Sequence, residues 1–294
     1  MNAALRRLAL SWFGLFILLP SLPAADEAVT LTGGNFEVEV VADVPYYEAK
    51  GGDPNKRKLD LYLPRGHKDY PVLLFVHGGG WTKGDRKGFE KLGRMFAKNG
   101  VGTAVISYRL TPEVQHPGHI EDVAGAFAWT QQNIAKHGGR PDKMFLSGHS
   151  AGGHLVALLA TDETYLKAQK LTLGDVKGVI PISGVYTLST GHFTRVFGED
   201  EEVRRKASPQ THVRGNLPPM LVLVAAKESA NFIKMAEEFA EALTKAKSTA
   251  ECIKAADRNH GTIAASLANE DDPTTQAMLK FIARYSNLKL TPKK

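Results

Sequence analysis

The sequence predicts an α/β fold, with a doubly wound, mostly parallel sheet and an antiparallel N-terminal edge. Two observations support this prediction. From residue 71 onward, short apolar runs alternate with helical stretches, and strands that are covered by helices on both faces have such continuous apolar runs. Before residue 66, leucines recur at a period of two, which is typical of antiparallel strands with one covered face. Alternating strands and helices imply right-handed crossover connections.

The N-terminus has the layout of a secretory signal peptide over residues 1–25. Arg6 and Arg7 precede an apolar segment at 8–19, and a short stretch of helix breakers and small residues follows. The apolar segment is too short to span a bilayer comfortably. We therefore expect cleavage after Ala24 or Ala25, export to the periplasm or the extracellular space, and no membrane span in the mature chain. An uncleaved N-terminal anchor is the alternative.

The remaining residues, 26–294, are expected to form one domain. The chain has 294 residues, of which 43% are hydrophobic and 23% are charged; this suits a single large α/β domain. Cys252 is the only cysteine, so no internal disulfide forms, and we expect an inert buried thiol on a strand at 250–255. The formal net charge of +6 is dispersed without a basic stripe, so no nucleic-acid partner is predicted.

Each predicted element follows from a local pattern. Segments 36–41 and 58–63 flank a turn at 51–55 and predict an antiparallel hairpin at the sheet edge. The apolar runs predict central strands at 72–76, 101–106, 144–146, 179–182 and 220–224. Helical patterns are found at 121–134, 153–160, 232–243 and 275–285. Residues 184–218 have no clear period, and a long aperiodic segment usually carries function, so we expect a cap or pocket-lining segment there.

A serine lies at the turn between a predicted strand and a predicted helix. Residues 148–152 read G-H-S-A-G and directly follow an apolar run. A nucleophile elbow occupies this kind of turn, where small neighbours relieve crowding. The N-terminus of the next helix directs its free N–H groups toward a developing oxyanion. We therefore predict that Ser150 is a nucleophile; a Gly-rich turn without chemistry is the alternative.

A second glycine-rich loop follows the first of the central strands. Residues 77–81 read H-G-G-G-W, and three glycines let a backbone approach a ligand with its N–H groups exposed. We predict that Gly79 and Gly80 form an oxyanion hole together with Ala151. The alternative is a phosphate-binding loop, but the helix and the Lys-Ser/Thr pattern of such loops do not follow. We expect His77 to fix the loop by hydrogen bonds rather than to transfer protons.

Together these motifs resemble those of the α/β-hydrolase carboxylesterases. The sequence has H-G-G-G-W at 77–81, Tyr-Arg-Leu at 108–110 and G-H-S-A-G-G-H at 148–154. This set is similar to the branch that contains bacterial feruloyl-esterase-like proteins, kynurenine formamidases and prenylcysteine methylesterases; hormone-sensitive-lipase-like esterases are more distant. The resemblance covers roughly residues 55–285. It implies an α/β-hydrolase fold and the hydrolysis of carboxylic esters.

A serine nucleophile needs a base and an orienting acid, which follow it in this fold in the order Asp/Glu, then His. The resemblance puts the histidine on the loop after the last strand, where His260 lies. Related esterases carry an Asp shortly after the strand that corresponds to 220–224, and Glu228 occupies the matching position here. We expect Glu228 to be the acid, with Asp257 as the runner-up. The alternative role for Glu228 is to favour the dipole of the next helix.

Four aromatic residues are candidates for the substrate pocket. Trp81 follows the glycine loop, and Tyr186, Phe193 and Phe197 belong to the aperiodic segment. For each of them, simple packing in the core is the alternative.

Other features of the sequence bear on ion pairs, metals and cofactors. Arg109 and Asp122 are expected to support each other beneath the site. The sequence has no H-E-x-x-H motif, no paired cysteines, no Asp-rich loop and no dinucleotide fingerprint, so neither a metal nor a cofactor is predicted.

These parts predict a secreted serine carboxylesterase that acts through a Ser-His-Glu triad and an acyl-enzyme. Export favours small, aryl or carbohydrate-linked esters, including esters attached to polysaccharides outside the cell. An amidase or formamidase with the same triad is one alternative. The other alternative is a hydrolase fold that has lost activity and serves as a binding module, which only the glutamate in place of aspartate favours.

Overall fold

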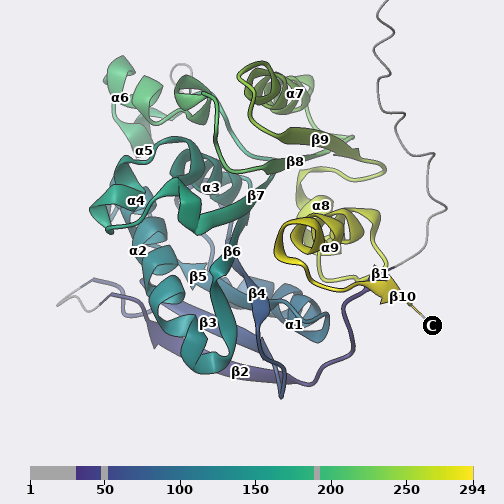
Figure 1. Ribbon diagram of the computed structural model, residues 1–294. Helices are drawn as coiled ribbons and strands as arrows, with labels where there is room; N and C mark the ends of the chain where they lie inside the picture. The colour runs from purple at the N-terminus through teal and green to yellow at the C-terminus, as the bar shows by residue number, and fades with distance from the viewer. Residues whose placement is uncertain (1–30, 48–51, 189–192, 294) are drawn as a thin grey trace, which may run out of the picture.

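The computed structural model describes residues 31–47, 52–188 and 193–293. The predicted signal peptide lies outside these residues. An eight-stranded sheet forms the centre of the described chain, and helices lie on both of its sides (Figure 1). The α/β fold predicted from the sequence is confirmed.

The strands of the central sheet are β2 (Val38–Pro45), β3 (Lys58–Pro64), β4 (Tyr70–Val76), β5 (Gly102–Ser107), β6 (Gly139–His149), β7 (Val176–Ile182), β8 (Met220–Ala225) and β9 (Ala250–Ala255). Their order across the sheet is β2-β3-β5-β4-β6-β7-β8-β9. β2 pairs with β3, and β3 with β5, in antiparallel register, whereas the pairs from β5 to β9 are parallel. The predicted edge hairpin, the five predicted central strands and the strand around Cys252 are therefore confirmed.

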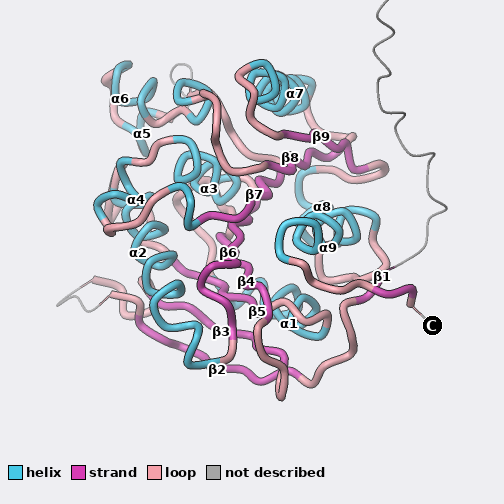
Figure 2. Tube along the Cα trace, viewed as in Figure 1, coloured by secondary structure: helices cyan, strands magenta, loops and turns pink. Residues whose placement is uncertain are grey.

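Helices cover the two faces of this sheet (Figure 2). One face carries α1 (Glu90–Lys98), α8 (His260–Ser266) and α9 (Pro273–Ser286). The other face carries α2 (Gly118–Asn133), α3 (Ala151–Thr161) and α7 (Ala230–Lys245). The helices predicted within 121–134, 153–160, 232–243 and 275–285 correspond to α2, α3, α7 and α9.

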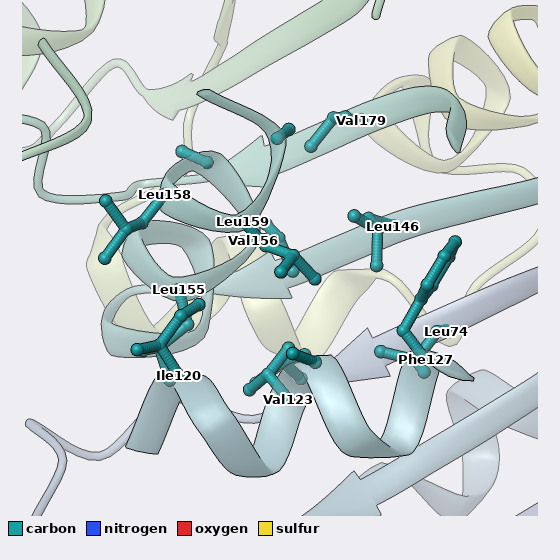
Figure 3. Packing of buried hydrophobic residues seen from close by; sticks show 14 of the residues in the cluster. Leu74, Ile120, Val123, Phe127, Leu146, Leu155, Val156, Leu158, Leu159 and Val179 are labelled. Atoms are coloured by element: carbon teal, nitrogen blue, oxygen red, sulfur yellow. The ribbon is translucent and has the colours of Figure 1, made fainter. Parts of the chain in front are cut away.

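The side chains of β4 show how one strand serves two cores. Successive side chains of a strand point to opposite faces, so Leu73 and Phe75 pack in the core under α1 and α9. Leu74 and Val76 pack in the core under α2 and α3. Figure 3 shows part of this second core, in which Leu74 lies near Phe127 of α2. Helices on both faces explain why the central strands are apolar without alternation.

The parallel strands direct their carboxyl ends to one edge of the sheet. β4 leads into the glycine loop at 77–81 and β6 into Ser150. Glu228 follows the end of β8, and His260 follows the end of β9. Loops at the carboxyl ends of parallel strands border a common crevice, so all the predicted chemical groups collect at this edge.

The segment 184–218, predicted as a cap or pocket-lining segment, contains two short helices, α5 (Thr194–Phe197) and α6 (Glu201–Lys206). The N–H of His116 donates to the carbonyl oxygen of Val196 in α5 at 2.9 Å. The imidazole Nε2 of His154, on α3, lies 2.8 Å from the carbonyl oxygen of Ala207. The first contact fastens the segment to the loop before α2, and the second fastens it to α3.

The two ends of the described chain lie together. β1 (Leu31–Thr32) pairs with β10 (Thr291–Pro292) in antiparallel register. The N–H of Gly33 donates to Oδ1 of Asn99 at 3.1 Å, and Asn99 lies just before β5 begins. The paired ends are therefore at the amino edge of the parallel strands. Among the described residues, none of the helices combines the length and the apolar character needed to cross a membrane.

Candidate active site

Ser150 occupies a strained turn between β6 and α3. Its backbone has φ 55° and ψ −117°, a region that non-glycine residues rarely adopt and that is common at functional sites. Its N–H donates to the carbonyl oxygen of Ile182 at 2.8 Å. The turn therefore lifts the Ser150 side chain out of the strand and places it at the start of α3.

The glycines on either side of Ser150 are required by close backbone packing. A Cβ at Gly148 would lie 2.5 Å from the carbonyl oxygen of Gly152. A Cβ at Gly152 would lie 2.1 Å from the carbonyl oxygen of Val76 in β4. Both distances are far shorter than real Cβ contacts, so the G-x-S-x-G pattern is a packing requirement of this turn.

The glycine loop lies directly against Ser150. A Cβ at Gly78 would approach the Cβ of Ser150 to 3.1 Å. Gly79 and Gly80 have φ values of 115° and 60°, which glycine adopts at no steric cost. Among the described residues, the N–H groups of Gly79, Gly80 and Ala151 have no hydrogen-bond partner. Backbone donors thus remain available on both sides of Ser150.

His77 holds the start of the glycine loop. Its Nδ1 lies 2.7 Å from the carbonyl oxygen of Gly78, and its ring stacks on Tyr108 with centroids 4.5 Å apart. Burial lowers the pKa of His77 to about 4. A neutral, buried imidazole with this partner fits the expected role of fixing the loop.

Ser150, His260 and Glu228 lie in one hydrogen-bonded line. Nε2 of His260 is 2.9 Å from Oγ of Ser150, and its Nδ1 is 3.1 Å from Oε2 of Glu228. The Glu228 side chain is only 2% exposed. Burial pushes the pKa of Glu228 upward, but hydrogen bonds from His260 and Ser183 outweigh it and hold this pKa below its ordinary value. Glu228 is therefore ionised at neutral pH, and it orients Nδ1–H of His260 toward itself.

The His260 loop is fixed by two neighbouring side chains. Asn259 caps α8, because its Oδ1 accepts from the N–H groups of Gly261 and Thr262 at 3.1 Å and 3.0 Å. His149, next to the serine, has its Nε2 2.8 Å from the carbonyl oxygen of His260. Since a carbonyl oxygen only accepts, this Nε2 carries the proton. Burial first, and then the charge of His260, lower the pKa of His149 to about 4.

Asp257, the runner-up for the acid, lies elsewhere. Its side chain is 84% exposed and pairs with Nζ of Lys227 at 2.9 Å. The structure therefore brings Glu228, and not Asp257, into contact with His260.

Three of the four candidate pocket aromatics lie together beside the glycine loop. The ring of Trp81 packs edge-on against Phe193, Phe197 and His154, with centroids 5.8 Å, 5.1 Å and 5.2 Å away. Trp81 and Phe197 are buried, and Phe193 is half-buried. Tyr186 is fully buried and stacks on Phe239 of α7 with centroids 4.3 Å apart. Tyr186 therefore packs in the core beneath the segment, separate from the Trp81 group.

An ion pair supports the segment that follows β5. Nη2 and Nε of Arg109 lie 2.7 Å and 3.0 Å from Oδ1 of Asp122 on α2. Two residues later, the N–H of Thr111 donates to the carbonyl oxygen of Trp81 at 2.9 Å. The expected pairing of Arg109 with Asp122 is therefore present, and the hydrogen bond from Thr111 ties the same segment to the glycine loop. In the described part of the chain, no cluster of three or more His, Cys, Asp or Glu side chains could hold a metal ion.

Ser183 is the site contact that the sequence did not reveal. Its Oγ donates a short hydrogen bond to Oε1 of Glu228. A serine at the end of a strand is common, so no local pattern marked it. The only usable signal was its place directly after β7, next to the strand that leads to Glu228.

Residues 59–243 match the model of the BD-FAE family. The chain belongs to the BD-FAE family. The matched part of this BD-FAE protein includes the glycine loop, the serine turn and Glu228, and it ends before His260.

Curated relatives of this BD-FAE protein include esterases and a formamidase. The chain is 33% identical over 216 residues to esterase LipC of Mycobacterium tuberculosis (strain ATCC 25618 / H37Rv), covering 65% of this chain and 53% of LipC. It is 29% identical over 258 residues to kynurenine formamidase of Danio rerio, covering 84% of this chain and 83% of the formamidase. The chain thus spans about half the length of the esterase relatives that it matches.

A solved structure supports the fold. Esterase B from Lactobacillus Rhamnosis (HN001) is similar with a TM-score of 0.73 and 21% sequence identity, covering 86% of this chain and 88% of that chain. The α/β-hydrolase fold and the resemblance to carboxylesterases, both predicted from the motifs, are confirmed.

Proposed function

We propose that this protein is a serine hydrolase that cleaves carboxylic esters, with Ser150 as nucleophile, His260 as base and Glu228 as acid. The observation that carries the proposal is the continuous hydrogen-bonded line from Ser150 through His260 to a buried, ionised Glu228. A nucleophile, a base within hydrogen-bond reach and an orienting third group are the parts that acyl transfer requires. Membership of the BD-FAE family and the similarity to esterase LipC also support it.

The proposed reaction has two steps. Nε2 of His260 removes the hydroxyl proton of Ser150, whose Oγ attacks the ester carbonyl. The N–H groups of Gly79, Gly80 and Ala151 stabilise the oxyanion, and the leaving alcohol takes the proton from His260 as the C–O bond breaks. A water molecule then gives a proton to His260 and attacks the acyl-enzyme. The acid is released and the proton returns to Ser150.

We propose that the enzyme is exported and acts on small, aryl or carbohydrate-linked esters. The charged and apolar pattern of residues 1–25 supports export. Esters attached to polysaccharides occur outside the cell, which makes them accessible to an exported hydrolase. The half-buried Phe193, whose ring packs edge-on against the buried Trp81, supplies apolar surface beside the glycine loop for an acyl or alcohol group.

Amide or formamide hydrolysis is the second candidate. The similarity to kynurenine formamidase extends over most of both chains, and the same three side chains can attack a formamide. A panel of nitrophenyl esters of graded length, methyl ferulate, acetylated xylan and N-formylkynurenine separates the two. Faster turnover of N-formylkynurenine than of every ester would favour the formamidase.

The test of a serine hydrolase uses a fluorophosphonate probe on the purified protein. We expect stoichiometric labelling of Ser150, no labelling of the Ser150→Ala variant, and a fall in ester turnover of about 10⁴-fold or more in that variant. A folded wild-type protein that takes up no probe would contradict the proposal and favour a non-catalytic binding module.

A further inference from the structure

We propose that Ser183 is a positioning residue that holds Glu228 in the orientation needed by His260; this inference rests on the proposed function. The two carboxylate oxygens of Glu228 have different partners. Oε2 faces Nδ1 of His260 at 3.1 Å, and Oε1 accepts the hydrogen bond from Oγ of Ser183. Ser183 touches none of the proposed reacting atoms, so it acts through Glu228.

The backbone of Ser183 is held in an unusual conformation. It has φ 46°, in the left-handed region that disfavours residues other than glycine, asparagine and aspartate. Its N–H donates to the carbonyl oxygen of Leu223 in β8 at 2.7 Å, and the residue is only 1% exposed. Backbone strain of this kind persists where the surroundings fix it, and it is concentrated at functional sites. The strained turn aims the Ser183 hydroxyl at Glu228.

The same turn also holds the nucleophile. The carbonyl oxygen of Ile182 accepts the N–H of Ser150 at 2.8 Å. On the other side of Ser183, a Cβ at Gly184 would lie 3.1 Å from the carbonyl carbon of Gly153 in α3. Residues 182–184 therefore contact the serine turn with their backbone and the acid with a side chain. This turn sets the position of Glu228 relative to Ser150.

A glutamate has a specific need for such a contact. Its side chain has one more rotatable bond than an aspartate would have, so more conformers compete with the one that faces His260. Binding Oε1 to a fixed hydroxyl selects one of them. Among the described residues, Glu228 is the only hydrogen-bond partner of the Ser183 hydroxyl, so the hydroxyl serves no other visible purpose.

The experiment is a double-mutant cycle between Ser183→Ala and Glu228→Asp, measured as kcat and KM on a nitrophenyl ester. We expect Ser183→Ala to lower kcat about 10- to 100-fold, because a small misplacement of a catalytic group has effects of this size. KM should stay within about twofold, since uniform substrate binding is unchanged. In the Glu228→Asp background the shorter carboxylate cannot reach both His260 and Ser183. Adding Ser183→Ala to that variant should therefore lower kcat by less than about threefold.

A matched control removes a buried serine hydroxyl that lies outside the site. Oγ of Ser147 donates to the carbonyl oxygen of Ile180 at 2.8 Å, between β6 and β7. We expect Ser147→Ala to keep kcat within about twofold. If Ser183→Ala fails to fold, Ser183→Gly replaces it in the cycle, because glycine accepts φ 46° without strain.

Three outcomes would overturn the role of Ser183. These are an unchanged kcat, a loss confined to KM, or an equal loss of kcat in both backgrounds, which indicates independent effects. The failure of the proposed function is distinguishable, because wild-type protein would then take up no fluorophosphonate. If the wild type is labelled at Ser150 and Ser183→Ala matches its kcat, only the inference about Ser183 fails.

Discussion

The two halves of the candidate site are held in place by different means. Ser150 and the glycine loop are fixed by backbone packing so close that Gly148 and Gly152 have no room for a Cβ. His260 and Glu228 are instead fixed by side-chain hydrogen bonds, from His149 to the loop of the base and from Ser183 to the acid. The position of Ser150 thus depends on glycines that have no side chain, and the positions of His260 and Glu228 depend on hydrogen bonds made by neighbouring side chains.

This difference indicates how each half responds to mutation. Close-packed backbone cannot relax around an added atom without moving β4, β6 and α3, so a change there affects the whole fold. A hydrogen-bonded side chain can be shortened or neutralised while the backbone stays in place. Mutations around Ser150 and the glycine loop should therefore mainly lower the stability of the fold. Mutations of Glu228 and its partners should mainly lower the rate of turnover.

The largest effect is expected for Gly152→Ala. Its Cβ would meet the carbonyl oxygen of Val76 at 2.1 Å, which forces β4 and α3 apart and should cost about 3 kcal/mol or more of the free energy of unfolding. Gly125→Ala on α2 is the matched control, because nothing lies within 4 Å of the added Cβ and alanine favours a helix by about 0.5–1 kcal/mol. Urea denaturation measures both. Equal stabilities of the two variants would contradict the packing argument.

The next effect is on rate, in the other half of the site. Glu228→Gln keeps the size of the side chain but removes its charge, so we expect kcat to fall about 10³- to 10⁴-fold with a small change in stability. Asp257→Asn is the control, because the exposed Asp257 pairs only with Lys227 among the described residues; its kcat should stay within twofold of the wild type. Steady-state ester hydrolysis compares them. The reverse pattern would assign the acid to Asp257.

A smaller, graded effect is expected from acid, and it tests the buried histidines that pack around the serine turn in both halves of the site. Burial lowers the pKa of His77 and His149 to about 4 and that of His154 to about 3. Their unfolded pKa is about 6.5. Between these values the unfolded chain binds more protons than the folded chain, so stability is complete above pH 6.5 and falls as the pH is lowered toward 4.

The measurement is the urea midpoint between pH 7 and pH 4.5. The loss should approach about 1.4 kcal/mol per pH unit for each such histidine within this window. In the His154→Gln variant the glutamine cannot take up a proton, but it keeps a donor for the carbonyl oxygen of Ala207. The urea midpoint of this variant should therefore fall less steeply with decreasing pH than that of the wild type. A midpoint that does not change with pH would contradict neutral, buried histidines around the serine turn.

The sequence was informative where burial and local geometry leave a repeated pattern. The five central apolar runs predicted β4 to β8, because a strand covered on both faces tolerates few polar residues. The helices of the aperiodic segment are different. α5 has four residues and α6 has six, which is too short for an apolar period to appear. The pairing of β1 with β10 joins segments at opposite ends of the chain, and no local pattern reports such a contact.

For the site, motifs located the residues but not all of their partners. The contact between Ser183 and Glu228 joins residues 45 positions apart, and the one between Ser150 and His260 joins residues 110 apart. The second was predictable because the chain order of the fold assigns a role to the later histidine. The first depends on the adjacency of β7 and β8 and on one strained turn. Tyr186 was proposed for the pocket but packs in the core against α7. The sequence alone does not distinguish an aromatic residue that lines a pocket from one that is buried in the core.

The pairing of β1 with β10 has a practical consequence for immobilising the protein. Both ends of the described chain meet at the amino edge of the parallel strands, beside Asn99, while Ser150 lies at the opposite, carboxyl edge. A purification tag after β10, or a surface anchor just before β1, would be attached at the edge of the parallel strands opposite Ser150. Coupling to a bead through either end is therefore expected to leave the Ser150 edge of the sheet accessible to a bulky polymer in solution.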